Sequence, residues 1–420
     1  MYSSQNMRAW DIALQADWLI RSLRAPAKSS AQRAQRECLM KHIFDDRFSS
    51  DVTQHYSLGR RRFLAGAVAA VVGGFVPSKG STEPSDSLKA RAAARGILYG
   101  CMVTRAMLQS SPDFCAAVAR EAAVIVPGNE MKWAWTQPRR GPANYRDSDA
   151  IGKFASENRL ALRGHTAAWH INLPAWVTQD LAAPAGRDLL DSRVRAVVGH
   201  FRGRVMEWDV VNEAIEPRDG LERSLRNSQL YRAGGATYIA DCFHAAHEAD
   251  PAALLVYNEY GLEYHTVEED RRREGTLRLL SDLKRQGIPL YGLGIQCHLK
   301  VGNRFNPKVF RKFLADVAAL GLKIRITEFD IDDQRLPVDI VERDRQVADH
   351  ARTFLEVAFD ERSLNGLITW GLSDRYTWLN AERPRADGAK KRPLPLDENL
   401  ARKPLWLAIA QCFDNAPMRG

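Results

Sequence analysis

The chain reads VMEWDVVNE over residues 205–213. This stretch is mostly apolar and rich in Val, as a buried strand is, and it ends on two polar side chains, Asn212 and Glu213. An amphipathic stretch of helix length follows, and the next apolar run begins at Ala253. A buried strand followed by a helix is the repeating unit of an α/β fold.

Similar apolar runs recur about every 30 to 45 residues from residue 96 onward, with charged, amphipathic stretches between them. We expect strands at 97–103, 122–126, 160–168, 205–211, 253–258, 290–297, 323–329 and 364–371. Eight such units in about 320 residues match a (β/α)8 TIM barrel, an eight-stranded parallel barrel with its active site at the C-terminal strand ends. The rival is a doubly wound open sheet, but no G-x-G-x-x-G follows the first expected strand.

Polar and aromatic residues crowd the C-terminal ends of most of the expected strands. The clusters are Asn129 to Trp133, Gly164 to His170, Trp208 to Glu213, Tyr257 to Tyr260, Gln296 to His298, Thr327 to Asp330 and Thr369 to Gly371. Because the strands of such a barrel all end on one rim, these side chains are expected to line a single cleft.

The basic excess of the chain lies near its N-terminus. The net charge is +9, but residues 1–95 hold 15 basic and 8 acidic side chains, which leaves only +2 for the rest. The folded body is therefore nearly neutral, and we do not expect nucleic acid as a partner. A hydrophobic content of 45% also excludes a disordered chain.

Residues 60–95 are typical of an export signal followed by a linker. Residues 60–64 read RRRFL, and an uncharged run continues to Ser78. The pattern resembles a bacterial twin-arginine signal, which predicts the twin-arginine export machinery as a partner and a periplasmic or secreted location. The alternatives are an uncleaved membrane anchor and a solvated basic run beside a buried helix. The run is shorter than the roughly 20 apolar residues of a spanning helix.

Residues 1–59 are unusually long for the region ahead of a signal, and Met40 offers a more ordinary start. We assign 1–59 to an N-terminal extension that need not belong to the natural product, and 96–415 to a catalytic domain. The cysteines show no C-x-x-C or metal-ligand spacing, and five of the six remain after signal removal. An odd number of cysteines cannot all pair, so a disulfide-independent fold fits this count, and disulfides stay an open alternative. We predict no metal and no cofactor.

Two carboxylates, Glu213 and Glu328, follow the fourth and seventh expected strands on opposite walls of the rim. Glycoside hydrolysis uses two carboxylates on either side of the scissile bond. A lone Glu at a strand end is more often an ion-pair partner, but Asn212 beside Glu213, and His298 and Asp330 near Glu328, favour catalysis. The chain has no G-x-S-x-G, no H-E-x-x-H and no P-loop, which excludes serine hydrolases, zinc proteases and NTPases.

The same motifs resemble glycoside hydrolase family 10, the retaining endo-β-1,4-xylanases. They are Asn129 to Trp133, Gly164 to His170, Trp208 to Glu213, Gly294 to Leu299, Ile326 to Asp330, Thr369 to Trp378 and Asp397 to Pro404. They occur in the family's order and span about residues 90–415. The resemblance implies endo-acting hydrolysis of β-1,4-xylosidic bonds in xylan, a polysaccharide partner and no cofactor. We expect the chain to act as a monomer.

Carried over residue by residue, the resemblance makes Glu213 the general acid/base and Glu328 the nucleophile of a double displacement. His298, oriented by Asp330, would keep Glu328 ionised. The charge of Glu328 would in turn favour a proton on Glu213 by like-charge repulsion. Asn212 would bind the 2-hydroxyl of the −1 sugar, where such contacts strengthen in the transition state.

The resemblance also assigns supporting and sugar-binding residues. Gln296 would orient the region around Glu213. The expected sugar-binding residues are Asn129, Lys132, His165, Trp169, Asn172, Trp370 and Trp378. Their polar groups would bind hydroxyls of the −1 and −2 sugars, and their indoles would contact sugar faces. A cis peptide between His165 and Thr166 is implied as well, whereas Trp133, Trp135 and Trp176 are expected to pack in the core or rim.

Two positions at the −2 subsite depart from the family's pattern. Gly128 stands where the family has Glu, and Asn172 stands where it has Gln. We expect extra room there and fewer hydrogen bonds to the distal sugar, at about 0.5 to 1.5 kcal/mol per lost bond. Xylan is the expected substrate. A decorated glycan, another β-1,4-glycan hydrolase on the same barrel and a non-catalytic glycan-binding barrel are the alternatives.

Overall fold

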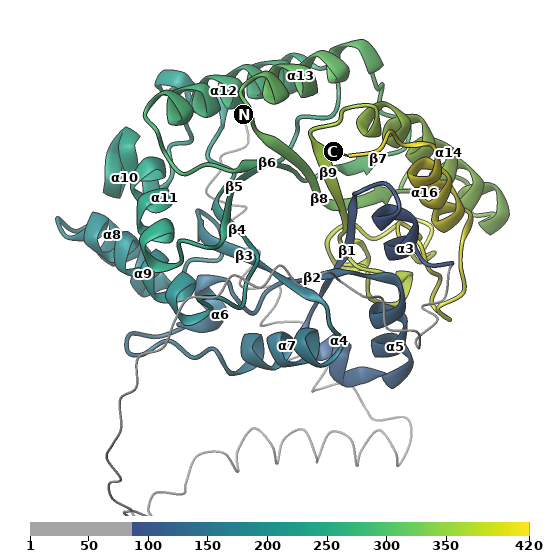
Figure 1. Cartoon of the computed structure of the whole chain (residues 1–420), viewed down its shortest axis with the longest axis horizontal. Helices are drawn as coiled ribbons and strands as arrows, with labels where there is room; N and C mark the ends of the chain where they lie inside the picture. The colour runs from purple at the N-terminus through teal and green to yellow at the C-terminus, as the bar shows by residue number, and fades with distance from the viewer. Residues whose placement is uncertain (1–85, 420) are drawn as a thin grey trace, which may run out of the picture. The chain divides into compact units, whose positions relative to one another are not determined.

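The computed structural model describes residues 86–419, which form a closed barrel of parallel strands surrounded by helices (Figure 1). The strands are β1 (Leu98–Val103), β2 (Val124–Pro127), β3 (Ala161–Trp169), β4 (Glu207–Asn212), β5 (Leu254–Glu259), β6 (Gly292–Ile295), β7 (His298–Lys300), β8 (Lys323–Asp332) and β9 (Leu364–Thr369). Pairing of β6 with β8 and of β9 with β1 closes the ring, and the short β7 pairs only with β8. The predicted (β/α)8 TIM barrel is confirmed.

Helices connect the strands on the outside of the barrel (Figure 1). They are α3 (Leu88–Ala93), α4 (Arg105–Ser110), α5 (Pro112–Glu121), α6 (Trp133–Thr136), α7 (Arg146–Glu157), α8 (Ala175–Leu181), α9 (Gly186–His200), α10 (Gln229–Gly234), α11 (Tyr238–Ala249), α12 (Val267–Arg285), α13 (Pro307–Ala319), α14 (Ile340–Phe359), α15 (Leu379–Glu382) and α16 (Pro404–Asn415). Short 3₁₀ turns are η1 (Pro217–Asp219), η2 (Glu222–Ser224), η3 (Gly235–Thr237) and η4 (Asp374–Tyr376). Several helices begin at residues that bind a free backbone N–H; Thr266 and Asp339, for example, cap α12 and α14.

Two expected strands differ most from those observed, whereas the bounds of the others shift by one or two residues. The run 290–297 forms β6 and then separates from β7 at Cys297, whose φ of +62° turns the chain. The run 323–329 extends to Asp332 because β7 pairs with its last residues. As a result, Glu328 lies well inside β8 rather than near its end.

The N-terminal boundary of the described structure lies close to the barrel. Residues 88–93, expected in the linker, form α3, whose N-cap Ser87 is fully buried and which packs on α16 and β1. The expected extension at 1–59 and the RRRFL signal lie outside the described residues. No helix within residues 86–419 is long and apolar enough to cross a membrane.

The interior of the barrel contains a layer of buried charges. Glu207 on β4 accepts a hydrogen bond from Arg163 of β3 at 2.6 Å and forms an ion pair with Arg325 of β8 at 2.8 Å. Arg163 also donates both terminal nitrogens to Asp209. Since β3 and β8 are not neighbours, these bonds cross the barrel, and each buried charge has an opposite partner.

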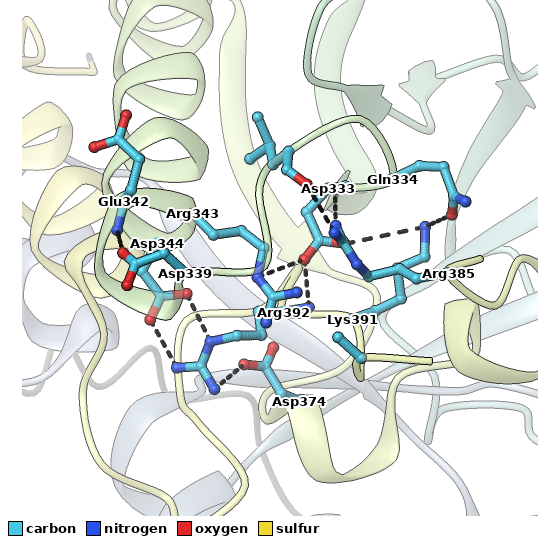
Figure 2. A network of polar contacts seen from close by, with 12 residues as sticks. Asp333, Gln334, Asp339, Glu342, Arg343, Asp344, Asp374, Arg385, Lys391 and Arg392 are labelled. Carbon is cyan, nitrogen blue, oxygen red and sulfur yellow. Dashed lines mark hydrogen bonds and ion pairs between the residues drawn. The ribbon is translucent and has the colours of Figure 1, made fainter. Parts of the chain in front are cut away.

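A second buried network holds the segment after β9 against the barrel (Figure 2). Asp333, directly after β8, lies 3.4 Å from Nε of Arg343 and accepts the backbone N–H of Arg392 at 3.1 Å. Arg392 in turn donates two hydrogen bonds to Asp344 on α14, at 2.8 and 2.7 Å. The network therefore ties α14 to the segment that also carries Trp378.

Candidate active site

Strands β4, β5 and β8 bring Glu213 and Glu328 into one group of buried polar side chains. The two residues are 9% and 5% exposed. Asn258 on β5 connects their surroundings, because its Nδ2 lies 2.9 Å from Oε1 of Glu328 and 2.8 Å from Oδ1 of Asn212. Nδ2 of Asn212 donates to Oε1 of Glu213 at 3.1 Å. A continuous hydrogen-bonded chain thus joins the two carboxylates.

Glu328 is surrounded by groups that stabilise its charge. Burial by itself raises the pKa of this carboxyl group. The hydrogen bond from His298 at 3.3 Å and the charges of His165, His298 and Lys132 outweigh burial and lower the pKa to about 2. A carboxylate that stays ionised at neutral pH can serve as a nucleophile.

His298 is itself held in place by Asp330. Its Nδ1 lies 2.9 Å from Oδ1 of Asp330, whose other oxygen accepts the indole N–H of Trp378 at 2.6 Å. Burial lowers the pKa of His298, but Asp330 and Glu328 outweigh it and raise the pKa to about 10. The ring is therefore a cation at neutral pH, and both of its nitrogens donate.

Glu213 has a different environment. Its Oε1 accepts hydrogen bonds from Nε2 of Gln296 at 2.9 Å and from Asn212 at 3.1 Å. Among the described residues, no basic side chain forms an ion pair with it. Neutral amide partners suit a carboxyl group that gains and loses a proton during a reaction.

The sequence motifs give no role to Asn258, although it connects the site. Its Oδ1 accepts the hydroxyl of Thr327 at 2.7 Å, and the side chain is completely buried. The amide group is therefore held in one position. A Cβ at Gly294 would lie only 2.2 Å from this oxygen. The only sequence signal is the position of Asn258 at the end of the fifth strand, next to the two strands that carry Asn212 and Gly294.

Lys132, Asn129 and Trp169 form one predicted sugar-binding group, and the structure brings them together. Nζ of Lys132 lies 3.3 Å from Oδ1 of Asn129 and 4.9 Å from the ring centre of Trp169. Burial lowers the pKa of Lys132. The negative charges of Glu328 and Glu213 act in the opposite direction, but their effect is smaller. Within residues 86–419, the buried indole nitrogen of Trp169 has no hydrogen-bond partner.

His165 and Trp370 lie beside this group. Nδ1 of His165 lies 2.9 Å from Oδ2 of Asp209, and this carboxylate also accepts a hydrogen bond from Arg163. The rings of His165 and Trp370 approach edge to face at 5.3 Å, and Trp370 also approaches His298 at 6.2 Å. The peptide between His165 and Thr166 is cis, as the resemblance implies.

The expectation of extra room beside Gly128 is wrong. A Cβ at this position would lie 2.7 Å from the sulfur of Met102 and 3.4 Å from Cγ2 of Thr104, because these side chains from β1 and its following turn occupy the space. Asn172 is exposed and has a φ of +57°, and its carbonyl accepts the backbone N–H of Ala134 at 3.0 Å.

The tryptophans expected to pack behave differently from one another. Trp133 is buried and meets Trp176 at 6.4 Å with perpendicular rings, so packing is confirmed for this pair. Trp135 is 52% exposed on α6 and therefore does not belong to the core.

The five described cysteines are free thiols. Within the described part of the chain, no group of three or more His, Cys, Asp or Glu residues could hold a metal ion.

Comparison with known proteins defines the class of this enzyme. The chain matches glycosyl hydrolase family 10 over residues 87–412, and it belongs to that family. The protein is therefore a glycoside hydrolase built on the barrel that carries the two carboxylates.

Several relatives have defined names. The chain is 32% identical to endo-1,4-beta-xylanase B of Thermotoga neapolitana over 310 residues, which cover 73% of this chain and 85% of that protein. It is 34% identical to an endo-1,4-beta-xylanase of Agaricus bisporus over 286 residues, 68% of this chain and 81% of the relative. The crystal structure of xylanase 10B from Thermotoga petrophila RKU-1 in complex with xylobiose is 30% identical, has a TM-score of 0.71, and covers 78% of this chain and 97% of that one.

Proposed function

We propose that the chain is an endo-1,4-β-xylanase that cleaves xylan with retention of configuration. In the first step, Oε of Glu328 attacks the anomeric carbon while Glu213 gives its proton to the departing glycosidic oxygen. In the second step, Glu213 removes a proton from water, which attacks the anomeric carbon and releases Glu328. No external co-reactant other than water is required.

The observation that carries this proposal is the difference between the two carboxyl environments. Glu328 has a cationic partner, His298, and a pKa of about 2, as a nucleophile needs. Within residues 86–419, the carboxyl group of Glu213 has neutral amide partners, Gln296 and Asn212, as an acid that becomes a base needs. Relatives named endo-1,4-beta-xylanases, matched over most of their length, favour xylan as the substrate.

The sugar-binding roles are part of the same proposal. Asn212 would bind the 2-hydroxyl of the −1 sugar, and Trp370 and Trp378 would pack against sugar faces near His298. Lys132, Asn129 and His165 would bind hydroxyls, and Asn172 would contact the next sugar from the exposed rim.

Substrate and stereochemistry are tested directly with the purified protein on xylan, cellulose and mannan. We expect short xylo-oligosaccharides from xylan alone, and proton NMR should show that the newly formed reducing end is first β. An α product formed first would contradict retention.

In a crystal structure, we expect the carboxyl groups of Glu213 and Glu328 to lie about 5 to 5.5 Å apart.

The division of roles is tested by leaving-group dependence. Glu328→Ala should abolish hydrolysis of every substrate, because no covalent intermediate can form. Glu213→Ala should retain kcat/KM on dinitrophenyl xylobioside and lose it on xylo-oligosaccharides, because only a poor leaving group needs a proton. Equal losses on both substrates in the Glu213 variant would reject its assignment as the acid.

We further propose export by the twin-arginine route and action as a monomer outside the cytoplasm. The basic RRRFL stretch before an uncharged run supports this route. Folding before export also fits the free thiols of the described cysteines. Replacing Arg60 and Arg61 by Lys should keep the enzyme in the cytoplasm of a bacterial host, as measured by cell fractionation. Continued export of the variant would contradict the route.

A further inference from the structure

The backbone groups of residues 213–215 form hydrogen bonds with side chains from other parts of the chain. Glu213 has a φ of +58°, in the left-handed region that most residues avoid. Its carbonyl accepts Nε of Arg226 at 2.8 Å. The next two N–H groups, of Ala214 and Ile215, donate to Oη of Tyr257 at 3.1 Å and to Oε2 of Glu259 at 3.0 Å.

Glu259 is at the centre of these bonds. Its carboxylate also accepts the hydroxyl of Tyr257 and the backbone N–H of Tyr260, the latter at 3.1 Å. The side chain is completely buried at the end of β5, so it does not reach a substrate in the cleft. A fully hydrogen-bonded buried carboxylate is fixed in position and can hold the groups that donate to it.

Glu259 also supports the side-chain partner of Glu213. The carbonyl of Glu259 accepts the backbone N–H of Gln296 at 3.0 Å. The side-chain amide of Gln296 then donates to Oε1 of Glu213 at 2.9 Å. One residue thus contacts both the backbone that carries Glu213 and the residue that holds its carboxyl group.

We propose that Glu259, together with Tyr257, is a positioning residue that sets where the carboxyl group of Glu213 meets the glycosidic oxygen. This inference rests on the proposed role of Glu213 as acid/base. It predicts that loss of Glu259 impairs proton transfer more than it impairs sugar binding or nucleophilic attack, because Glu328 has separate supports in His298 and Asn258.

The test measures kcat and KM on an activated and an unactivated substrate. For Glu259→Ala and Tyr257→Phe, kcat/KM on xylo-oligosaccharides should fall about 10- to 100-fold, within the range that general acid catalysis supplies. On dinitrophenyl xylobioside, kcat/KM should fall less than about 3-fold. On this activated substrate, kcat and KM should fall together. The second step, hydrolysis of the covalent intermediate, also needs Glu213, so the intermediate accumulates when that step is slow. Glu259→Gln keeps an oxygen acceptor of the same length and should recover most of the activity.

Glu121→Ala is the matched control for Glu259→Ala. Glu121 is also completely buried and accepts a backbone N–H, from Leu88 at 3.0 Å, and an indole N–H, from Trp406 at 3.1 Å, away from the cleft. Its loss should lower the melting temperature without changing the ratio of the two kcat/KM values. If Glu259→Ala does not fold, Tyr257→Phe gives the same readout.

An equal loss on both substrates in a folded Glu259 or Tyr257 variant, or no loss on either, would overturn the inference. If Glu213→Ala still shows the expected leaving-group dependence, only the positioning role of Glu259 fails. If Glu213→Ala itself loses both activities equally, the proposed acid/base role fails instead.

Discussion

At the scale of single residues, His298 controls the charge of Glu328, since it donates to this carboxylate and is itself a cation at neutral pH. We expect His298→Asn to raise the pKa of Glu328, because a hydrogen bond and a positive charge are lost while burial remains. The ionised form of Glu328 is the reactive one. A higher pKa therefore moves the acidic limb of the pH profile of kcat/KM to higher pH, by about one unit or more.

The measurement is kcat/KM from acidic to neutral pH, and His244→Asn serves as the control. His244 is exposed on α11 and has no contact with the site, so its variant should reproduce the wild-type profile. An acidic limb that stays in place in His298→Asn would show that other groups keep Glu328 ionised.

At the scale of elements, Gly294 on β6 lies against the side chains of Asn258 on β5 and Thr327 on β8. An added methyl group would lie 2.2 Å from Oδ1 of Asn258 and 2.9 Å from Cγ2 of Thr327. Gly294→Ala should therefore displace Asn258 and break its bonds to Asn212 and Glu328. We expect overpacking to lower the free energy of unfolding by about 1 to 3 kcal/mol. We expect kcat/KM to fall by about 100-fold, the effect of a small misplacement at a reacting centre.

Urea denaturation and steady-state kinetics measure these two effects. Gly199→Ala on α9 is the matched control, because the nearest atom to its new Cβ lies 4.0 Å away. That variant should be as stable as the wild type or more so, by up to about 1 kcal/mol, since Ala favours helix more than Gly does. Full activity in Gly294→Ala would show that Asn258 does not need its observed position.

At the scale of the whole molecule, the network around Asp333 joins α14 to the segment after β9 (Figure 2). Asp333 is completely buried beside Arg343 and Lys391. In Asp333→Ala, Arg343 and Lys391 lose this neighbouring carboxylate. We expect the free energy of unfolding to fall by about 3 to 5 kcal/mol, the usual cost of removing one partner of a buried ion pair.

The comparison is with Asp316→Ala, which removes an exposed ion pair with Lys312 at 2.7 Å on α13. This variant should lose less than about 1 kcal/mol. Chemical denaturation of both variants gives the two differences. Equal losses would show that the buried network contributes no more than a surface pair.

The sequence alone is enough to predict the barrel, because strand length and apolar character are local properties that recur in each of the eight units. It also predicts that Glu213, Glu328 and His298 share one rim, because parallel strands all end on the same side of a barrel. The resemblance adds the cis peptide at His165. These features depend on chain direction and on short motifs, so they can be read without the tertiary structure.

Other features depend on residues that are far apart in the chain, and only the tertiary structure decides them. Met102 fills the space beside Gly128, and Asn258 bridges Asn212 and Glu328. Glu259 accepts the N–H group two residues after Glu213. The physical reason is that side-chain reach and hydrogen-bond geometry are set by the closed ring, which places residues from different strands within 3 Å of one another, whereas a linear motif specifies only neighbours along the chain.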